Sequence, residues 1–399
     1  MRFYLPSRTC TFATDLEALT FGLLTFPMFS RILITGGAGF IGSHLSDELL
    51  ARGYKVRVID SLLPQVHGAS RQRPEYLCDD VELIVGDVRD EKLMAKALDG
   101  VDAVFHLAAA VGVGQSMYQI ANYSDANCLG TATLLELLAK RSVAKLVVAS
   151  SMSVYGEGLY RGGSGEIYHG VERRLDQLKR REWEVCDQNG EHLQPIPTPE
   201  SKTPSVPSVY ALSKYYQERL CLATGPAYGI PTIALRFFNV YGARQALSNP
   251  YTGVIAIFSS RILNDRAPLV NEDGQQHRDF IYVKDVALAC RLALESEDSS
   301  GCVFNVGTGT CCTIEKLARD LARYLGHEDL EPEITGRYRV GDVRHCFADI
   351  SRAREILGFR PRYSVEAGLT EMLDWLAGQT AEDRAYAASD ELMKRGLTG

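Results

Sequence analysis

Near its beginning the chain carries the glycine-rich segment Thr35-Gly36-Gly37-Ala38-Gly39-Phe40-Ile41-Gly42. The β-branched run Arg31–Thr35 leads into it, and the helical pattern Ile41–Ala51 leads out of it. Glycines at such a corner let the backbone turn tightly, approach a pyrophosphate and pack the helix on the sheet. The first N–H groups of the helix and the positive end of its dipole then face the phosphates. The segment therefore predicts a dinucleotide site, although glycines alone would also fit an ordinary strand-to-helix turn.

The alternation of short apolar runs and helical patterns continues along the chain. The further runs are Lys55–Asp60, Val81–Gly86, Ala103–His106, Lys145–Ser150 and Thr232–Phe237. Because their apolar character is continuous, both faces of the sheet must be covered by helices, as in a parallel sheet. Helical segments such as Ala126–Lys140 fill the gaps. The pattern predicts an α/β fold with a doubly wound parallel Rossmann-type sheet.

An acidic residue, Asp60, closes the second predicted strand eighteen positions after Gly42. A carboxylate at this place can accept hydrogen bonds from both ribose hydroxyls of a dinucleotide, and it would repel a 2′-phosphate. We therefore expect NAD rather than NADP. The same carboxylate strengthens the interpretation of the glycine turn.

Two further segments should contact the cofactor. Asp87, next to Val88, could accept from the adenine amino group, or it could cap the helix that follows. The fourth predicted strand ends on His106-Leu107-Ala108-Ala109, whose small residues leave room for a flat ring and a ribose. His106 itself should make a hydrogen bond within the sheet and have no catalytic role. The residues expected to bind NAD from these motifs are Gly36, Gly39, Phe40, Ile41, Gly42, Asp60, Asp87, Val88, Leu107, Ala108 and Ala109, together with Tyr210 and Lys214.

A catalytic pair is indicated by Tyr210-Ala-Leu-Ser-Lys214 at the start of a helical pattern. The tyrosine and the lysine lie one turn apart and project from the same face of the helix. Tyrosine ordinarily has a pKa near 10, too high for a base at neutral pH. An ammonium and a positive nicotinamide ring nearby would favour the phenolate and lower that pKa. On its own the spacing would also fit two surface residues.

The fifth predicted strand supplies the third catalytic group. It ends on Ser150-Ser151-Met152-Ser153, and ligands of open α/β sheets bind outside the carboxyl ends of the strands. The Ser151 hydroxyl would therefore hydrogen-bond the substrate oxygen that Tyr210 deprotonates. In this order the motifs predict a site for reversible hydride transfer.

Composition excludes several other functions. The 399 residues carry a formal net charge of −7, whereas nucleic-acid binding requires a basic surface. The sequence contains no run of eighteen apolar residues, so we expect no membrane span. The ten cysteines show no disulfide or metal-binding spacing, so we expect reduced thiols, no metal and a cytoplasmic location.

The domain organisation follows from changes in this pattern. Residues 1–27 form a leader of doubtful status, since Met28 would be a natural start and Pro27 interrupts an otherwise apolar stretch. Polar residues between about 157 and 208 predict an insertion that is part hairpin and part lid. The expected parts are a Rossmann domain of residues 28–237 plus about 280–308, a smaller domain of residues 238–279 plus 309–378, and a tail of residues 379–399.

Four additional motifs carry a resemblance to a known family. They are Asn127-Cys-Leu-Gly-Thr131, Arg236-Phe-Phe-Asn239-Val-Tyr-Gly242, Arg278-Asp-Phe-Ile-Tyr282-Val-Lys-Asp285-Val and Arg339-Val-Gly-Asp342. With them the chain, over residues 31–375, resembles the extended short-chain dehydrogenase/reductase family, and within it the NAD-dependent sugar-nucleotide epimerases and dehydratases. The resemblance implies that the smaller, mixed α/β domain binds the sugar nucleotide.

The resemblance also implies roles for individual residues. Asn127 joins the cofactor site, and Asn239 holds the sugar or the diphosphate. Arg278 and Arg339 grip the diphosphate, since a guanidinium can bind two oxygens at once, although each could instead form a surface ion pair. Asp342 meets the nucleoside ribose. Ser151, Met152 and Ser153 contact the sugar, and helices 126–140 and the one from Tyr210 imply a homodimer.

The reaction itself is narrowed by the residues after Ser151. Dehydratases of the family carry Asp-Glu there, as an acid and a base for water loss, whereas this chain has Met152-Ser153. The resemblance therefore favours a 4-epimerase, and the insertion and the segment Gln245–Gly253 resemble bacterial epimerases of dTDP-L-rhamnose. A nucleotide-sugar 4-ketoreductase, a 4,6-dehydratase and an NAD-binding redox sensor without catalysis remain alternatives.

Overall fold

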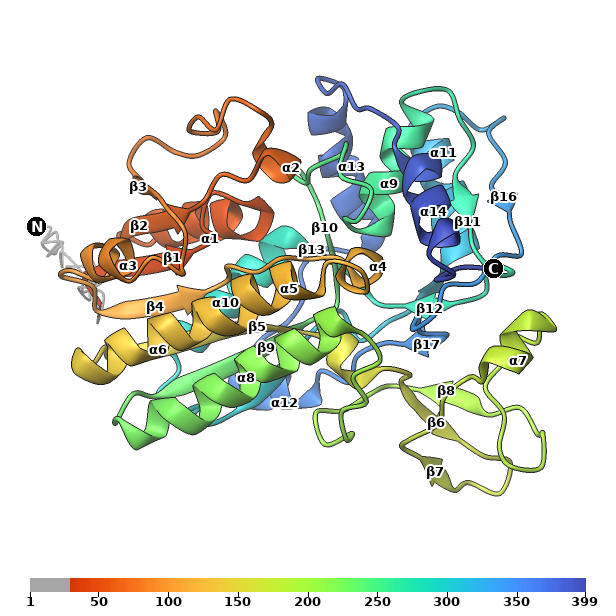
Figure 1. Ribbon diagram of the computed structural model, residues 1–399, viewed down its shortest axis with the longest axis horizontal. Helices are drawn as coiled ribbons and strands as arrows, with labels where there is room; N and C mark the ends of the chain where they lie inside the picture. Colours follow the sequence, from red (N-terminus) through yellow and green to blue (C-terminus); the bar gives the residue numbers. More distant parts are fainter. Residues whose placement is uncertain (1–28) are drawn as a thin grey trace, which may run out of the picture.

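A seven-stranded parallel sheet forms one half of the molecule (Figure 1) in the computed structural model, which describes residues 29–399. The strand order is β14-β9-β5-β4-β1-β2-β3. The strands are β1 (Arg31–Thr35), β2 (Lys55–Asp60), β3 (Glu82–Val85), β4 (Ala103–His106), β5 (Lys145–Ser151), β9 (Thr232–Phe237) and β14 (Val303–Val306). The predicted doubly wound α/β fold is confirmed. The leader expected over residues 1–27 lies outside the described part of the chain.

Alternate residues of each central strand pack into two separate hydrophobic cores, because successive side chains of a strand point to opposite faces. Ile32 and Ile34 of β1 join the core under α1 (Phe40–Leu50) and α10 (Val283–Glu295). Leu33, between them, joins the core under α3 (Glu91–Ala97), α6 (Gly130–Lys140) and α8 (Val209–Ala227). This two-sided burial is why the strands are apolar throughout.

Two elements differ from their predicted limits. The helix expected over residues 126–140 begins as a π-helical turn, Ser124–Leu129, and continues as α6. The seventh strand, β14, was not named from the sequence. It pairs in parallel with β9 at the sheet edge.

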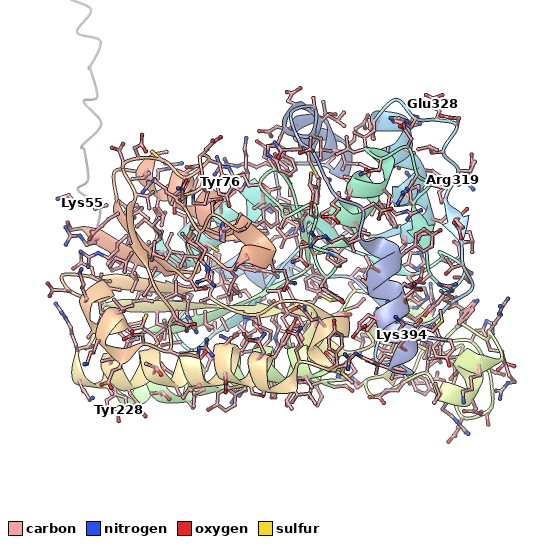
Figure 2. The ribbon with its side chains drawn as sticks, turned by 45° about the horizontal axis from the view of Figure 1, so that its top comes forward. Lys55, Tyr76, Tyr228, Arg319, Glu328 and Lys394 are labelled. Atoms are coloured by element: carbon pink, nitrogen blue, oxygen red, sulfur yellow. The ribbon has the colours of Figure 1, made fainter. Side chains whose placement is uncertain are left out.

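The other half of the molecule consists of short strands and helices beyond the carboxyl ends of the large sheet (Figure 1). Its strands pair as β10 (Asn239–Tyr241) with β13 (Phe280–Tyr282), β11 (Leu269–Val270) with β16 (Glu333–Ile334), and β12 (His277–Arg278) with both β15 (Cys312–Thr313) and β17 (His345–Cys346). Its longer helices are α9 (Val254–Ile262), α11 (Ile314–Tyr324), α13 (Val365–Leu376) and α14 (Ala385–Lys394). Figure 2 shows the two halves with their side chains. Lys55, at the amino end of β2, lies in the first half, and Lys394, on α14, lies in the second. The domain limits given above stay a prediction.

The insertion, residues 157–208, forms a small antiparallel sheet of β7 (Ile167–Tyr168), β6 (Leu159–Arg161) and β8 (Gln194–Ile196), with α7 (Leu175–Lys179) beside it. The β6–β7 pair is the expected hairpin. The expected lid is not formed, since none of these residues, all of which the structure describes, lines the cavity between the two halves. A buried ion-pair network holds the insertion beside that cavity instead. In it Arg344 contacts Glu184 and Asp273, and Arg173 contacts Glu157 and Glu272.

Four of the remaining short elements contribute residues to the cavity wall: α2 (Pro64–His67), α4 (Val113–Ser116), α5 (Ile120–Tyr123) and the 3₁₀ turn Met152–Tyr155. The last, α12 (Ser351–Ile356), packs against β14 instead. Within residues 29–399, no helix has both the length and the apolar character needed to cross a membrane.

Candidate active site

A cavity of about 840 Å³ lies outside the carboxyl ends of the parallel strands, between the two halves. Its wall combines the glycine turn, the ends of β2, β4 and β5, the start of α8, and residues of the second half. This is the place where open α/β sheets bind their ligands. Within the described residues, no cluster of three or more His, Cys, Asp or Glu side chains could hold a metal ion.

The glycine turn packs so closely against neighbouring backbone that Gly36 and Gly42 leave no room for a side chain. Gly36 has a φ of +68°, and a Cβ there would lie 2.9 Å from the Cα of Ala108. A Cβ on Gly42 would lie 2.6 Å from the Gly36 oxygen. Gly39, the N-cap of α1, leaves the first turn of that helix without a side-chain cap. The free N–H groups face the cavity, and the cradle fits a pyrophosphate.

Asp60 ends β2 and lines the same cavity as this cradle. Its carboxylate accepts hydrogen bonds from the backbone N–H groups of Ala38 (3.1 Å) and Leu62 (2.9 Å). His67 on α2 approaches it at 3.6 Å. No Lys or Arg ion pair neutralises Asp60 within the part of the chain that the structure describes. The site therefore fits the ribose hydroxyls of NAD and would repel the phosphate of NADP.

Most of the other predicted cofactor residues line the cavity, whereas Asn127 does not. Asp87, Val88, Leu107, Ala108 and Ala109 line the cavity, as do Phe40 and Ile41. Asp87 does not cap a helix, because the cap of α3 is Asp90, which accepts from Lys92 and Leu93. Hydrogen bonds from Arg89 instead hold the pKa of Asp87 below its usual value.

Asn127 is buried behind the cavity wall rather than on it. Its amide oxygen accepts from the N–H of Ala110 (2.6 Å), and its amide nitrogen donates to Ala110 O (3.1 Å) and Ser213 Oγ (2.8 Å). All of these partners are protein atoms. Asn127 is therefore placed to shape the loop after β4 and to join it to α8.

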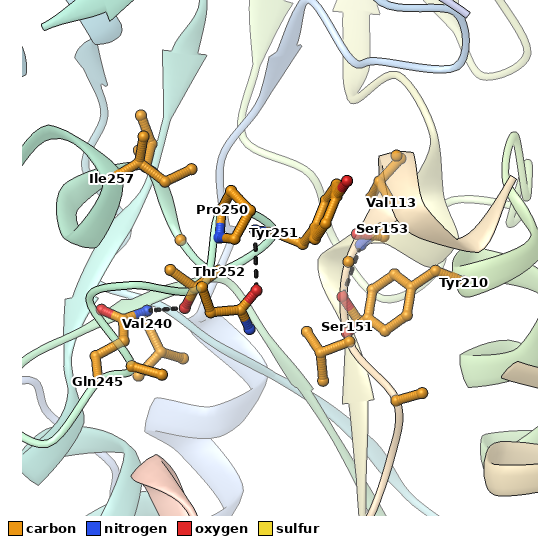
Figure 3. Close-up of a pocket in the computed structure, with 18 of the residues that line it drawn as sticks. Val113, Ser151, Ser153, Tyr210, Val240, Gln245, Pro250, Tyr251, Thr252 and Ile257 are labelled. Carbon is orange, nitrogen blue, oxygen red and sulfur yellow. Dashed lines mark hydrogen bonds between the residues drawn. The ribbon is translucent and has the colours of Figure 1, made fainter. Parts of the chain in front are cut away.

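Ser151 and Tyr210 meet on one side of the pocket, with Val240 and Gln245 on the other (Figure 3). Ser151 ends β5, and its hydroxyl accepts from the N–H of Ser153 at 3.2 Å. Tyr210 begins α8, where its backbone N–H donates to Ser116 Oγ at 3.0 Å. The ring of Tyr123 packs edge-on against it, with centroids 6.5 Å apart. These contacts fix the phenol at the carboxyl end of the sheet.

The protonation of this pair depends on burial. Burial raises the pKa of the Tyr210 phenol above its usual value, and the neighbouring Ser151 hydroxyl lowers it in part. Burial also lowers the pKa of the Lys214 ammonium to about 8. Lys214 donates to Gln217 at 2.7 Å, one turn further along α8. Positive charge brought beside Tyr210 by a ligand would shift its pKa back toward neutrality.

His106 is held inside the sheet, as predicted. Its ring nitrogens pair with the hydroxyls of Thr35 (2.8 Å) and Thr131 (2.9 Å), and burial lowers its pKa to about 3. It is therefore neutral and does not line the cavity.

The predicted substrate residues all line the cavity: Ser151, Met152, Ser153, Asn239, Arg278, Arg339 and Asp342. They differ in how many hydrogen bonds their side chains already make to other protein groups. The guanidinium of Arg278 already donates to the carbonyls of His277 (3.0 Å) and Arg344 (2.8 Å) and to that of Val343. Arg339 has a half-exposed side chain that is only 4.0 Å from Asp342.

Three amide oxygens on the cavity wall have no hydrogen-bond partner within residues 29–399. They belong to Asn239, Gln245 and Gln276. Buried polar atoms without partners are rare and costly, so these oxygens fit a ligand that brings hydroxyl or N–H donors. The sequence pointed to Asn239 and, through a resemblance, to the Gln245 segment. Gln276 was missed because a lone glutamine carries no local signal.

Sequence reasoning missed two further groups. Gln65 on α2 donates to Gln115 (3.2 Å) and to Asn249 (3.0 Å), so three distant segments meet beside the cavity, which Asn249 lines. Arg337 and the C-terminal residues 385–399 also form part of the wall. None of these belongs to a recognisable motif, and only the folded chain brings them together.

Comparison with known proteins identifies the family. A model of the NAD dependent epimerase/dehydratase family matches residues 32–172 and 185–307. The chain belongs to this family. The predicted family, the NAD cofactor and the assignment as an isomerase are therefore confirmed.

Individual members of the epimerase/dehydratase family cover nearly the whole chain. A dTDP-L-rhamnose 4-epimerase of Burkholderia thailandensis is 36% identical over 87% of this chain and 95% of that protein. A UDP-N-acetylglucosamine 4-epimerase of Methanobrevibacter ruminantium, solved with UDP-N-acetylmuramic acid, is 32% identical, with a TM-score of 0.72 over 88% of this chain and 99% of that one. A Thermus thermophilus UDP-glucose 4-epimerase solved with NAD is 31% identical, with a TM-score of 0.69 over 88% and 100%.

Proposed function

We propose that this protein is a 4-epimerase that interconverts dTDP-L-rhamnose and dTDP-6-deoxy-L-talose with retained NAD. The observation that carries the choice of reaction is the pair Met152-Ser153, which lines the cavity directly after Ser151. A thioether and a hydroxyl cannot supply the acid and the base that water elimination requires. The sugar should therefore leave the site with the mass that it had on entry.

Tyr210 is the proposed base. It takes the proton from the hydroxyl on C4 of the sugar, and Ser151 holds the same oxygen by hydrogen bonding. When bound, NAD accepts the hydride from C4 and later returns it. Lys214, charged below its pKa of about 8, favours the phenolate electrostatically and would hold the ribose of bound NAD. The 4-keto sugar then turns over in the cavity, so that the hydride returns to the opposite face of C4. Tyr210 gives its proton back to the oxygen on C4.

The choice of a 6-deoxy sugar rests on two supports. Met152 presents an apolar surface on the cavity wall, only 8% exposed, beside Val154 and Phe238. A methyl group at C6 suits such a surface better than a hydroxymethyl group, with a discrimination of about 1–3 kcal/mol. The second support is the similarity to the Burkholderia thailandensis protein. Other relatives are UDP-glucose 4-epimerases, so slow turnover of UDP-hexoses is expected.

We also propose a homodimer formed through α6 and α8. These helices lie side by side on one face of the sheet (Figure 1). Large apolar side chains remain exposed along them: Leu129 at 53%, Leu212 at 55% and Tyr216 at 41%. Light scattering should give twice the mass of the chain, and Leu212→Glu should shift it toward the monomer. A wild-type monomer at micromolar concentration would contradict this proposal.

The deciding experiment is NMR of the sugar after incubation of dTDP-L-rhamnose with the pure enzyme and no added reductant. The expected product is inverted at C4, with constant absorbance at the nicotinamide wavelength. Inversion of UDP-galactose or a UDP-uronic acid without inversion of the deoxy sugar would retain the 4-epimerase and refute the substrate. A product lighter by one water would restore the dehydratase. Stoichiometric loss of reduced cofactor would indicate the 4-ketoreductase.

A further inference from the structure

The C-terminal segment, residues 385–399, forms one wall of the cavity. The family match ends at residue 307, and the sequence left these residues as a tail. The lining residues of this segment are Ala385, Tyr386, Ala388, Ser389, Leu392, Leu397 and Thr398. They lie opposite the cofactor cradle, at the end of the cavity formed by the second half.

This segment holds the strand-like residues 338–340 by backbone pairing. Tyr338 N–H donates to Gly399 O at 2.9 Å, and Val340 N–H donates to Leu397 O at 2.9 Å. Gly399 N–H donates back to Tyr338 O at 3.2 Å. Because side chains two positions apart in an extended segment point to the same side, Arg337 and Arg339 are presented together. Both line the cavity.

Arg337 makes fewer hydrogen bonds to protein atoms than Arg278, which also lines the cavity. Its Nη1 donates to Ser389 Oγ on α14 at 3.4 Å, and it forms no ion pair with any carboxylate of residues 29–399. Arg278, by contrast, is occupied by backbone carbonyls. What distinguishes Arg337 from other arginines that form no ion pair is its place on the cavity wall. A guanidinium in this position can bind two oxygens of one phosphate group.

The same segment is held at both of its ends by contacts with other elements. At one end Arg261 of α9 pairs with Asp383 at 3.1 Å and lies 4.7 Å over the ring of Tyr386. At the other end Arg395 lies 4.3 Å over the ring of Tyr118, which follows α4 on the cofactor side. Figure 1 shows α14 beside α9 and β11, with the C-terminus next to it. Removal of this contact surface would leave both Arg337 and Arg339 without their support.

We propose that Arg337 is an additional phosphate-binding residue for the diphosphate of a nucleoside diphosphate sugar, positioned by the C-terminal segment. The inference rests on the proposed function only in that the ligand carries a diphosphate. The contact of Arg337 is electrostatic and bidentate, and it falls on the phosphates rather than on the reacting carbon. Its loss should therefore raise KM and leave kcat nearly unchanged.

The test compares dTDP with dTMP, and UDP with UMP, by calorimetric titration of the full-length, NAD-containing protein. Arg337→Gln should raise the dissociation constants of the diphosphates about 10- to 100-fold, and those of the monophosphates much less. Arg337→Lys should restore part of the loss. The matched control is Arg323→Gln, since Arg323 is exposed on α11 and pairs with Asp320. It should bind all four nucleotides like the wild type, and all variants should retain NAD.

The C-terminal role is tested by deleting residues 397–399, which removes the backbone pairing and leaves α14 intact. Diphosphate affinity should fall about 3- to 10-fold, and the effect should be less than additive with Arg337→Gln. Unchanged diphosphate binding in Arg337→Gln, or an equal loss for monophosphates, would overturn the assignment of Arg337. A deletion variant that binds like the wild type would overturn the positioning role. A wild type that binds UDP but not dTDP would refute the proposed substrate, while the UDP and UMP titrations would still test Arg337.

Discussion

The two halves that face the cavity hold their functional side chains in different ways. On the cofactor side, Asp60 and Ser151 end long parallel strands, and Tyr210 begins a helix of 19 residues. On the substrate side, Arg278 lies in a strand of two residues, and Arg339 lies in a connection between two such strands. The first set is positioned by regular backbone with buried packing on both faces. The second set is positioned by side-chain networks and by pairing with the C-terminus.

The difference shows most clearly in the charges that each half buries. The cofactor half keeps its buried ion pairs few and local, as in Arg236 with Glu218, at 2.6 Å. The substrate half joins the insertion to β12 and β17 through a connected set of buried charges. Such a set is costly to break, because each lost partner leaves an uncompensated charge. On the cofactor side, removal of a single chemical group should therefore reduce turnover. On the substrate side, disruption of the charge network should reduce the stability of the fold.

The largest effect is expected on the cofactor side, at Tyr210. Tyr210→Phe should reduce turnover by about 10²–10⁴-fold, the range for a positioned acid–base group, and should leave bound NAD unchanged. Ser151→Ala should cost less, because its hydroxyl orients the substrate. The matched control is Tyr228→Phe, at the exposed C-cap of the same helix. A Tyr210→Phe enzyme with nearly wild-type rate would require another base.

The next effect is expected on the substrate side, as a loss of stability. The Arg344 side chain is fully buried and contacts Glu184, Glu272 and Asp273. Arg344→Met should lower the free energy of unfolding by up to about 3 kcal/mol, the lower end of the range for a broken buried pair. Glu272, which is buried, keeps Arg173, whereas Glu184 and Asp273 are partly exposed to solvent. Arg384→Met, which removes one exposed pair with Glu382, is the control and should change it by less than about 1 kcal/mol. Urea unfolding measures both, and equal losses would refute the role of the network.

A smaller effect should separate cofactor recognition from catalysis. Asp60→Ala should weaken NAD about 10- to 100-fold, the usual worth of hydrogen bonds to a charged group. Asp60→Asn should weaken it less and narrow the preference over NADP, because repulsion of the 2′-phosphate is lost. Fluorescence titration of the cofactor-free protein measures both constants. Equal or tighter binding of NADP by the wild type would contradict the assignment.

The smallest effect is a pH dependence within the substrate-side network. The hydrogen bonds from His345 and Arg344, against the opposing effect of burial, together lower the pKa of Glu184 to about 2. A carboxyl whose pKa is depressed by folding stabilises the protein above its unfolded pKa of about 4.3. That stabilisation is lost as the pH falls toward 2. The stability difference between the wild type and Glu184→Gln should therefore shrink between pH 5 and pH 2, and a constant difference would show that Glu184 is not charge-paired.

The sequence predicted the parts of the site that depend on local backbone. The glycine turn, Asp60, the serine at the end of β5 and the Tyr210–Lys214 turn each combine a residue type with a strand or helix end. The sequence left open whether Asp87 contacts the cofactor or caps the next helix, and the structure assigns the cap to Asp90. The insertion was harder, because its polar composition fits a lid as well as a docked sheet. Long-range contacts show that it is docked: the ion pairs of Arg173 and Arg344, and the backbone pairing of Thr198 with Ala348.

By itself the sequence determined the α/β alternation, the NAD preference and the family, because these follow from periodicity and from residues close together in the chain. The tertiary structure decided which side chains share the cavity. It brought Gln65 to Asn249 and Ser389 to Arg337, and it withdrew Asn127 and most of Arg278 into protein contacts. The physical reason is that local backbone geometry is fixed by nearby residues. A wall built from loops and a C-terminal helix depends on long-range packing that no short pattern records.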